Sequence, residues 1–140
     1  RQRQMCIRDR VVTVSVHAAS NFPLRKVASD HDLPLADATG DQEYLAVIGD
    51  RLPGLLDKIR PQLVLYNAGV DPHRDDRLGK LGLSDEGLLQ RDHLVIDACL
   101  RRSIPLASVI GGGYDAMGAL VQRHALVFRA ACDQARLHGL

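Results

Sequence analysis

Two kinds of hydrophobic pattern recur along the chain, and together they predict an α/β fold. Short apolar runs with the β-branched content of strands occur at residues 11–16, 63–67 and 104–110. Longer stretches with apolar residues at helical spacing lie between residues 39 and 61, 84 and 102, and 115 and 139. This alternation predicts parallel strands joined by right-handed crossovers.

Several helix boundaries can be predicted from capping residues. Thr39 and Gln42 match a capping box, in which the threonine oxygen accepts a hydrogen bond from an orphan amide. Ser84 is the expected N-cap of the second helix, because two acidic residues follow it in the first turn. Pro53 should kink or divide the first helix, because proline removes one backbone donor.

Three segments carry further structural expectations. Residues 17–40 are polar and show no clear period, so we expect a long loop there, which is either functional or stands for an element that the pattern does not reveal. The run 63–67 is apolar without interruption, as in parallel strands that are buried on both faces. The last helix should turn an apolar set inward, consisting of Met117, Leu120, Val121, Phe128, Cys132 and Ala135.

The composition is that of one globular domain. The 140 residues are 46% hydrophobic and 25% charged, a length that allows a single core. No apolar run approaches the ~20 residues that span a bilayer, so we do not expect a membrane protein. Residues 1–10 carry four arginines and one aspartate, so the net charge of +1 leaves −2 for residues 11–140. Because the rest of the chain has no basic patch, we expect no direct nucleic-acid contact.

The cysteines and the first ten residues bear on location and chain organisation. Cys6, Cys99 and Cys132 lie far apart, and the last two fall on apolar faces of predicted helices. We expect small buried thiols in a reducing, cytoplasmic compartment, without a disulfide framework. Residues 1–10 follow neither pattern and are interpreted as a non-native leader, with a disordered basic tail as the alternative. On the leader interpretation, residues 11–140 begin within a domain.

Two of the predicted strands end in residues that could carry chemistry. Residues 104–110 run into Gly111-Gly112-Gly113 and then Tyr114, and residues 63–67 run through a glycine to Asp71. Because ligands bind beyond the carboxyl ends of parallel strands, we expect Asp71 and Tyr114 to face one site. A carboxylate can ligate a cation, and a phenol can donate to a developing oxyanion. A loop residue and a packed turn are the respective alternatives.

Other polar residues are weaker candidates. His17 and His73 lie at the same rim, but neither has the i, i+4 partner of a helical metal pair. Ser15 lacks the Gly-x-Ser-x-Gly elbow of a serine nucleophile. The charged loop at residues 74–77, which includes Asp75 and Asp76, is interpreted as a solvated turn.

Three segments, in this order, resemble the zinc-dependent histone deacetylase superfamily, and most of all its bacterial acetylpolyamine and acetoin-utilisation type. They are Thr13-Val14-Ser15-Val16-His17 with Asn21-Phe22-Pro23, Ala68-Gly69-Val70-Asp71 through Asp76-Arg77-Leu78-Gly79, and Ile110-Gly111-Gly112-Gly113-Tyr114. The resemblance covers residues 11–135. It implies a three-layer arginase/deacetylase-like α/β fold, with a parallel sheet flanked by helices, of which residues 11–140 are similar to the C-terminal part.

The resemblance also implies roles for single residues. Asp71 corresponds to the last of three zinc ligands, and Tyr114 to the tyrosine that polarises the acetyl carbonyl and stabilises the oxyanion. Ser15 and the Val16 carbonyl match positions that hold a structural potassium ion. The acyl channel is implied at Phe22, Gly112 and Gly113. The implied substrate is an acetylated amine, either acetyl-lysine in a protein or an acetylpolyamine, and Fe²⁺ is an alternative metal because this ligand type also accepts iron.

The sequence departs from the family in one respect. The family's Asp-x-His zinc pair and its tandem histidines precede the strand that begins at Val11, and residues 1–10 match neither. We therefore expect this polypeptide alone neither to bind zinc tightly nor to hydrolyse amides. Two alternatives stay open. One is a non-catalytic α/β binding domain, and the other is a nucleotide-binding half domain that uses the glycines as a phosphate nest.

Overall fold

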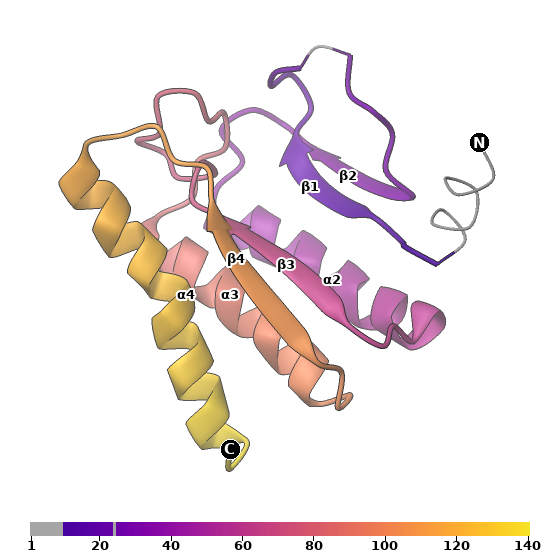
Figure 1. The fold of residues 1–140 in the computed structure, drawn as a ribbon. Helices are drawn as coiled ribbons and strands as arrows, with labels where there is room; N and C mark the ends of the chain where they lie inside the picture. Colours follow the sequence, from indigo (N-terminus) through magenta and orange to yellow (C-terminus); the bar gives the residue numbers. More distant parts are fainter. Residues whose placement is uncertain (1–9, 24) are drawn as a thin grey trace.

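The computed structural model describes residues 10–23 and 25–140, which form strands and helices in alternation (Figure 1). The elements are β1 (Val14–Ala18), β2 (His31–Leu35), α2 (Asp41–Ile59), β3 (Val64–Gly69), α3 (Asp85–Leu100), β4 (Leu106–Gly111) and α4 (Met117–Leu137). The predicted strand and helix order is confirmed, with β2 as an addition. In the described residues, no helix has the length and apolar character needed to cross a bilayer.

The strands form two parallel pairs, β1 with β2 and β3 with β4. In the second pair Val64 lies opposite Leu106 and Gly69 opposite Gly111, so both strands end at the same level. Figure 1 shows α2 and α3 behind this pair and α4 beside β4. Because both connections return to the same end of the sheet, the loops that follow β3 and β4 emerge side by side.

The strand β2 lies inside the segment that we expected to be a loop. Residues 31, 33 and 35 are wholly or partly buried, whereas Asp32 and Pro34 between them are exposed. This is the period-two pattern of a half-buried strand, but it is short and contains a proline. Pairing with β1 supplies the backbone hydrogen bonds that make it a strand. The prediction of a continuous loop over residues 17–40 is therefore wrong.

The starts of α2 and α3 differ in their capping. Ser84 caps α3 as predicted, since its hydroxyl oxygen accepts a hydrogen bond from the Gly87 amide at 3.0 Å. At α2 the capping residue is Gly40, without a side-chain bond, and the buried Thr39 hydroxyl has no hydrogen-bond partner among the described residues. The capping box was therefore a wrong prediction. Pro53 does not divide α2, which is continuous from Asp41 to Ile59.

The core lies where α2, α3 and the loop after β3 meet. Leu83 and Leu88 are fully buried, and Val70 packs in the same cluster. A second cluster forms around Cys99 at the far end of α3. Cys99 is thus buried as predicted, whereas Cys132 is exposed and Cys6 lies outside the described residues.

The orientation of α4 differs from the one predicted, although Leu120 of the predicted set does pack against the core. Four members of the apolar set that we placed inward, Met117, Val121, Phe128 and Cys132, are exposed. The buried face carries Leu126 and Val127, but also Arg123 at 8% exposure. Arg123 forms ion pairs with carboxylates of three other segments, and these long-range contacts fix the rotation of the helix.

The free face of the β3–β4 pair also differs from expectation. Leu63 and Leu65 are exposed, Leu65 to 76%, and so is Val109 on β4. Among the described residues the helices cover one face of this pair, so the apolar side chains of the opposite face lie open. The prediction that residues 63–67 are buried on both faces is wrong for this chain.

Candidate functional site

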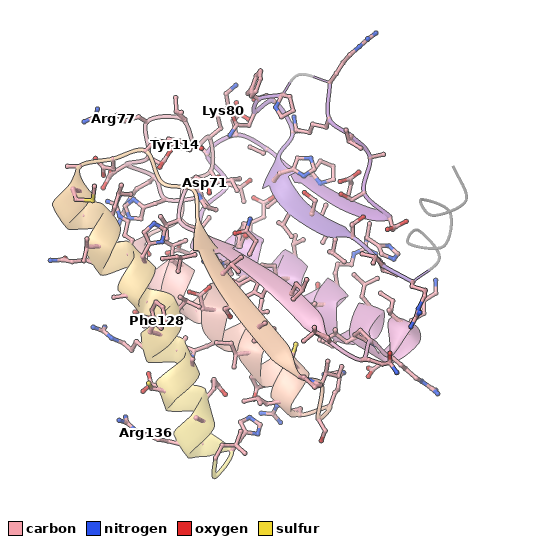
Figure 2. The ribbon with its side chains drawn as sticks, in the orientation of Figure 1. Asp71, Arg77, Lys80, Tyr114, Phe128 and Arg136 are labelled. Atoms are coloured by element: carbon pink, nitrogen blue, oxygen red, sulfur yellow. The ribbon has the colours of Figure 1, made fainter. Side chains whose placement is uncertain are left out.

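The loops after β3 and β4 converge on the carboxylate of Asp71. A β-carbon built on Gly112 would lie 2.1 Å from Asp71 Oδ1, and one built on Gly69 would lie 2.7 Å from the same atom. Gly112 also has φ +63°, a conformation that favours glycine. Figure 2 shows Asp71 and Tyr114 at the same end of the β3–β4 pair. The predicted meeting of the two strand ends is confirmed.

The Asp71 carboxylate is partly buried and in an unfavourable setting for a negative charge. Burial raises the pKa of Asp71, and the neighbouring Asp76 carboxylate raises it further. A backbone hydrogen bond and the Arg91 guanidinium oppose these effects. A cation beside this partly buried carboxylate would offset the cost of burying its negative charge.

Tyr114 presents its side chain to solvent, although its backbone is fixed. The residue is 52% exposed, and no hydrogen bond of its hydroxyl is found among the described residues. Its amide donates to Asp76 Oδ2 at 2.7 Å. The preceding glycines have φ of +63° and +93°, so the chain turns sharply before the tyrosine. The phenol is therefore available to a ligand while its attachment point is held.

Asp76 holds both loops together. Its Oδ1 accepts hydrogen bonds from the Leu78 amide at 2.9 Å and the Gly79 amide at 2.7 Å, while Oδ2 takes the Tyr114 amide. The carboxylate is 8% exposed, so the interpretation of residues 74–77 as a solvated turn is wrong for Asp76. In the sequence Asp-x-x-Gly, the aspartate side chain commonly accepts hydrogen bonds from the backbone amides of its own turn. The role of Asp76 could therefore have been predicted from the sequence.

A second link joins the same loops through α4. Arg123 donates to Asp115 Oδ2 at 2.8 Å and lies 3.3 Å from Asp75 Oδ2. It is also 3.4 Å from Asp85 Oδ1. Residues 75–76 are thus connected to residues 114–115 twice, once directly and once through a buried guanidinium.

The candidate His73 is part of this scaffold. Its Nδ1 accepts from the Asp75 amide at 3.1 Å, and its Nε2 lies 3.3 Å from Asp85 Oδ1. Burial lowers the pKa of His73, with Arg123 acting in the same direction. The ring is 3% exposed and occupied on both nitrogens, so it holds the loop rather than facing a ligand.

The buried ion pair of Arg91 and Asp92 on α3 holds the end of β3 through a hydrogen bond to its backbone. Arg91 Nη1 donates to the Gly69 carbonyl at 2.6 Å, and Arg91 Nε donates to Asp92 Oδ1 at 2.9 Å. The Tyr66 hydroxyl donates to the same aspartate oxygen, and burial raises the pKa of Tyr66. Adjacent charged residues in a helix are usually solvated, so the sequence carried no clear signal for this network.

The other predicted site residues lie on or after β1. Ser15 and Val16 are within β1, and the Ser15 hydroxyl is 2.9 Å from His17 Nδ1. Phe22 follows the strand and is 85% exposed, belonging to neither hydrophobic cluster of the described chain. Within the described residues, no hydrogen bond or hydrophobic cluster links Phe22 to Asp71 or Tyr114.

Lys80 connects the Phe22 loop to the Asp71 loop indirectly. Its Nζ donates to the Ser20 hydroxyl at 2.8 Å and to the Ser20 carbonyl at 3.1 Å, and it lies 3.8 Å from Asp37 Oδ2. The residue stands at the same upper end of the molecule as Asp71 and Tyr114 (Figure 2). The segment that precedes Phe22 is therefore tied to the loop that follows Asp71.

The described part of the chain does not contain a complete set of ligands for a catalytic metal ion. Over residues 10–23 and 25–140, no group of three or more histidine, cysteine, aspartate or glutamate side chains is arranged to hold a metal ion. A catalytic zinc site takes three protein ligands. The partly buried carboxylate of Asp71 is of a type that can supply one such ligand, and the described residues do not make up the full set.

Comparison with known proteins agrees with this geometry. A family model described as the histone deacetylase domain matches residues 2–131. The chain belongs to the histone deacetylase family. The resemblance seen in the sequence is thereby confirmed, and it extends across both site loops.

The alignment with this chain covers only part of each relative. An uncharacterized protein of Picosynechococcus is 47% identical over 124 residues, which are 88% of this chain and 41% of that protein. Histone deacetylase 2 of Arabidopsis thaliana is 34% identical over 85 residues, which are 61% of this chain and 22% of that protein. The chain thus spans less than half the length of these relatives.

A solved structure confirms the fold class. The acetylpolyamine aminohydrolase from Burkholderia pseudomallei superposes with a TM-score of 0.71 at 21% identity, covering 86% of this chain and 37% of the other. The match supports the arginase/deacetylase α/β fold predicted from the sequence. The motifs that carried the prediction end β3 and β4, where the fold brings Asp71 and the glycine loop together.

Proposed function

We propose that the full-length protein containing this chain is a zinc-dependent deacetylase that hydrolyses an acetyl amide. The observation that carries this proposal is the contact between the Asp71 carboxylate and the Gly112 backbone, in a chain of the histone deacetylase family. In this proposal Asp71 is a metal ligand, and it lies beside the loop that ends in the exposed Tyr114 phenol. The substrate is an acetylated amine, either acetyl-lysine in a protein or an acetylpolyamine.

Asp71 and Tyr114 have separate roles in this proposal. Asp71 supplies one carboxylate oxygen to Zn²⁺, and Fe²⁺ suits the same ligand type. When bound, the metal would act as a Lewis acid toward the acyl group and the attacking water. The Tyr114 hydroxyl donates a hydrogen bond to the oxygen on which negative charge develops, a contact worth roughly 3 kcal/mol in acyl chemistry.

The remaining candidates shape or support the site. Gly112 and Gly113 are proposed to line the acyl channel, where they must be glycine because a side chain on Gly112 would meet Asp71 and one on Gly113 would meet Val70 and Leu120. The exposed ring of Phe22 offers an apolar wall to the substrate chain. The Ser15 hydroxyl and the Val16 carbonyl are proposed to hold a structural potassium ion behind the metal.

The test uses the full-length protein and two substrates, an acetyl-lysine peptide and an acetylpolyamine. We expect hydrolysis that a chelator abolishes and that added Zn²⁺ restores. Asp71→Asn should lose bound zinc and activity together, whereas Tyr114→Phe should keep the metal and lose about 10²–10³-fold in kcat. Chelator-insensitive hydrolysis, or full activity in both variants, would overturn the proposal.

A non-catalytic binding domain is the second candidate. The hydrogen bonds and ion pairs that hold the two loops together would be the same whether or not the site catalyses a reaction. It predicts that the intact protein binds an acetylated amine without hydrolysing it. Calorimetric titration with the same two substrates, at zinc saturation, separates this case from an enzyme.

A further inference from the structure

The Asp76 carboxylate divides its hydrogen bonds between the two site loops. Oδ1 accepts from Leu78 and Gly79, in the loop that begins at Asp71, and Oδ2 accepts from Tyr114, in the loop after β4. All three donors are backbone amides. Such charge-assisted bonds are about twice as strong as neutral ones, and a buried carboxylate needs them.

The turn made by Oδ1 is in direct contact with the Asp71 backbone. A β-carbon on Gly79 would lie 1.9 Å from the Asp71 carbonyl oxygen and 3.1 Å from Asp76 Cβ. The loop is therefore closed tightly on itself, and the position of Asp76 is fixed relative to Asp71. Whatever Asp76 Oδ2 holds is fixed relative to Asp71 as well.

The backbone at Tyr114 is held by contacts before and after the residue. The two glycines before it have positive φ, Gly112 lies against the Asp71 carboxylate, and no hydrogen bond of the Tyr114 hydroxyl is found in the described chain. The Asp115 that follows is held by Arg123, which also approaches Asp75. The backbone on both sides of the phenol is thus tied to the pair Asp75–Asp76.

We infer that Asp76 is a positioning residue, which sets the Tyr114 phenol relative to Asp71 by holding the Tyr114 amide. This inference rests on the proposed function, because it treats Asp71 and Tyr114 as parts of one reaction site. Catalysis depends on such placement, since a misplacement of about 1 Å can cost 10²-fold in rate.

The first test measures the contact itself by amide hydrogen exchange in the full-length protein. In Asp76→Asn, the single amide oxygen can serve the Leu78 and Gly79 amides, and the new NH₂ group then faces the Tyr114 amide. We expect exchange at Tyr114 to rise about 10- to 100-fold, with α4 unchanged. Unchanged exchange at Tyr114 in a folded variant would overturn the inference, whether or not the protein is a deacetylase.

The second test measures the consequence for catalysis with a double-mutant cycle. Asp76→Asn should lower kcat about 10- to 100-fold with KM and zinc content unchanged, and it should cause no further loss in the Tyr114→Phe background. An equal loss in both backgrounds would mean that Asp76 does not act through Tyr114. Asp50→Asn, an exposed carboxylate on α2, is the matched control and should change nothing.

A third variant covers the case in which Asp76→Asn does not fold. Replacement of Tyr114 by its α-hydroxy acid converts the amide to an ester, which removes the donor to Asp76 Oδ2 and leaves Asp76 itself unchanged. We expect the same fall in kcat, with the turn at Leu78 and Gly79 intact. Wild-type kcat in this ester variant would contradict the inference, whereas absence of hydrolysis in the wild type would count against the proposed function alone.

Discussion

Asp71 Oδ1 occupies the space that a side chain on Gly112 would need, with only 2.1 Å to the position of a β-carbon. Gly112→Ala should therefore displace the carboxylate and strain a backbone at φ +63°. We expect a loss of about 1–3 kcal/mol in the free energy of unfolding, together with loss of zinc binding in the full-length protein. Thermal unfolding and metal analysis measure the two effects.

Gly118→Ala is the matched control for this substitution. Gly118 lies in the first turn of α4, and a β-carbon there would have no neighbour within 4 Å. Alanine is favoured over glycine in helices by up to about 1 kcal/mol, so we expect equal or higher stability. If both substitutions destabilised the protein to the same extent, the contact with Asp71 would not be the cause.

Asp71→Asn should stabilise the metal-free protein at neutral pH. Because burial raises the pKa of Asp71 in the folded state, folding binds protons between the unfolded and folded pKa values. The contribution of Asp71 to the free energy of unfolding therefore falls as pH rises through that interval. We expect the variant to be more stable at pH 7, with the difference shrinking as pH falls toward the unfolded pKa.

Denaturant unfolding at pH 7 and at pH 4, with a chelator present, checks this prediction. Asp50→Asn serves again as the comparison, since an exposed carboxylate on α2 should change stability by less than about 0.5 kcal/mol. A lower stability of Asp71→Asn at pH 7 would show that the charge is stabilised in the folded chain.

Thr39→Val should also raise the stability. The Thr39 hydroxyl is buried and has no hydrogen-bond partner among the described residues, and an unsatisfied buried group costs roughly 1–3 kcal/mol. Valine has nearly the same shape and removes the hydroxyl. We expect a gain of about 1 kcal/mol by thermal unfolding, whereas Ser84→Ala, which removes a cap, should lose about 1 kcal/mol.

The 140-residue chain by itself should not hydrolyse acetyl amides. The residues that the structure describes contain Asp71 as a candidate ligand but no cluster of three metal-binding side chains. We expect no hydrolysis of an acetyl-lysine peptide above the rate of a Tyr114→Phe version of the same chain. Chelator-sensitive hydrolysis by the purified 140-residue chain would refute this expectation.

The sequence predicted those parts of the fold that depend on local pattern and chain direction. The two strands that end near Asp71 and Gly112 were recognisable because each apolar run stops at a glycine. Parallel pairing then forces their ends together, and the structure confirms this. The Ser84 cap was readable for the same reason, since its signal lies within one turn of helix.

The parts that were missed depend on contacts between distant residues. The inward face of α4 was wrong because Arg123 is drawn inward by Asp75, Asp85 and Asp115, which no local period records. In the sequence Arg91 and Asp92 look like surface charges. In the fold they are buried, because Arg91 donates to the Gly69 carbonyl and Asp92 accepts from the Tyr66 hydroxyl.

The shared carboxylate of Asp76 has a consequence for exchanging parts between homologous proteins. Since one side chain serves the loop after β3 and the loop after β4, neither loop is a separate module. In a chimaera that receives only one of the two loops, the Asp76 carboxylate and the amides that it binds come from different parent proteins. Their positions then do not match. Recombination at this end of the sheet should therefore succeed when both loops are transplanted as a single unit.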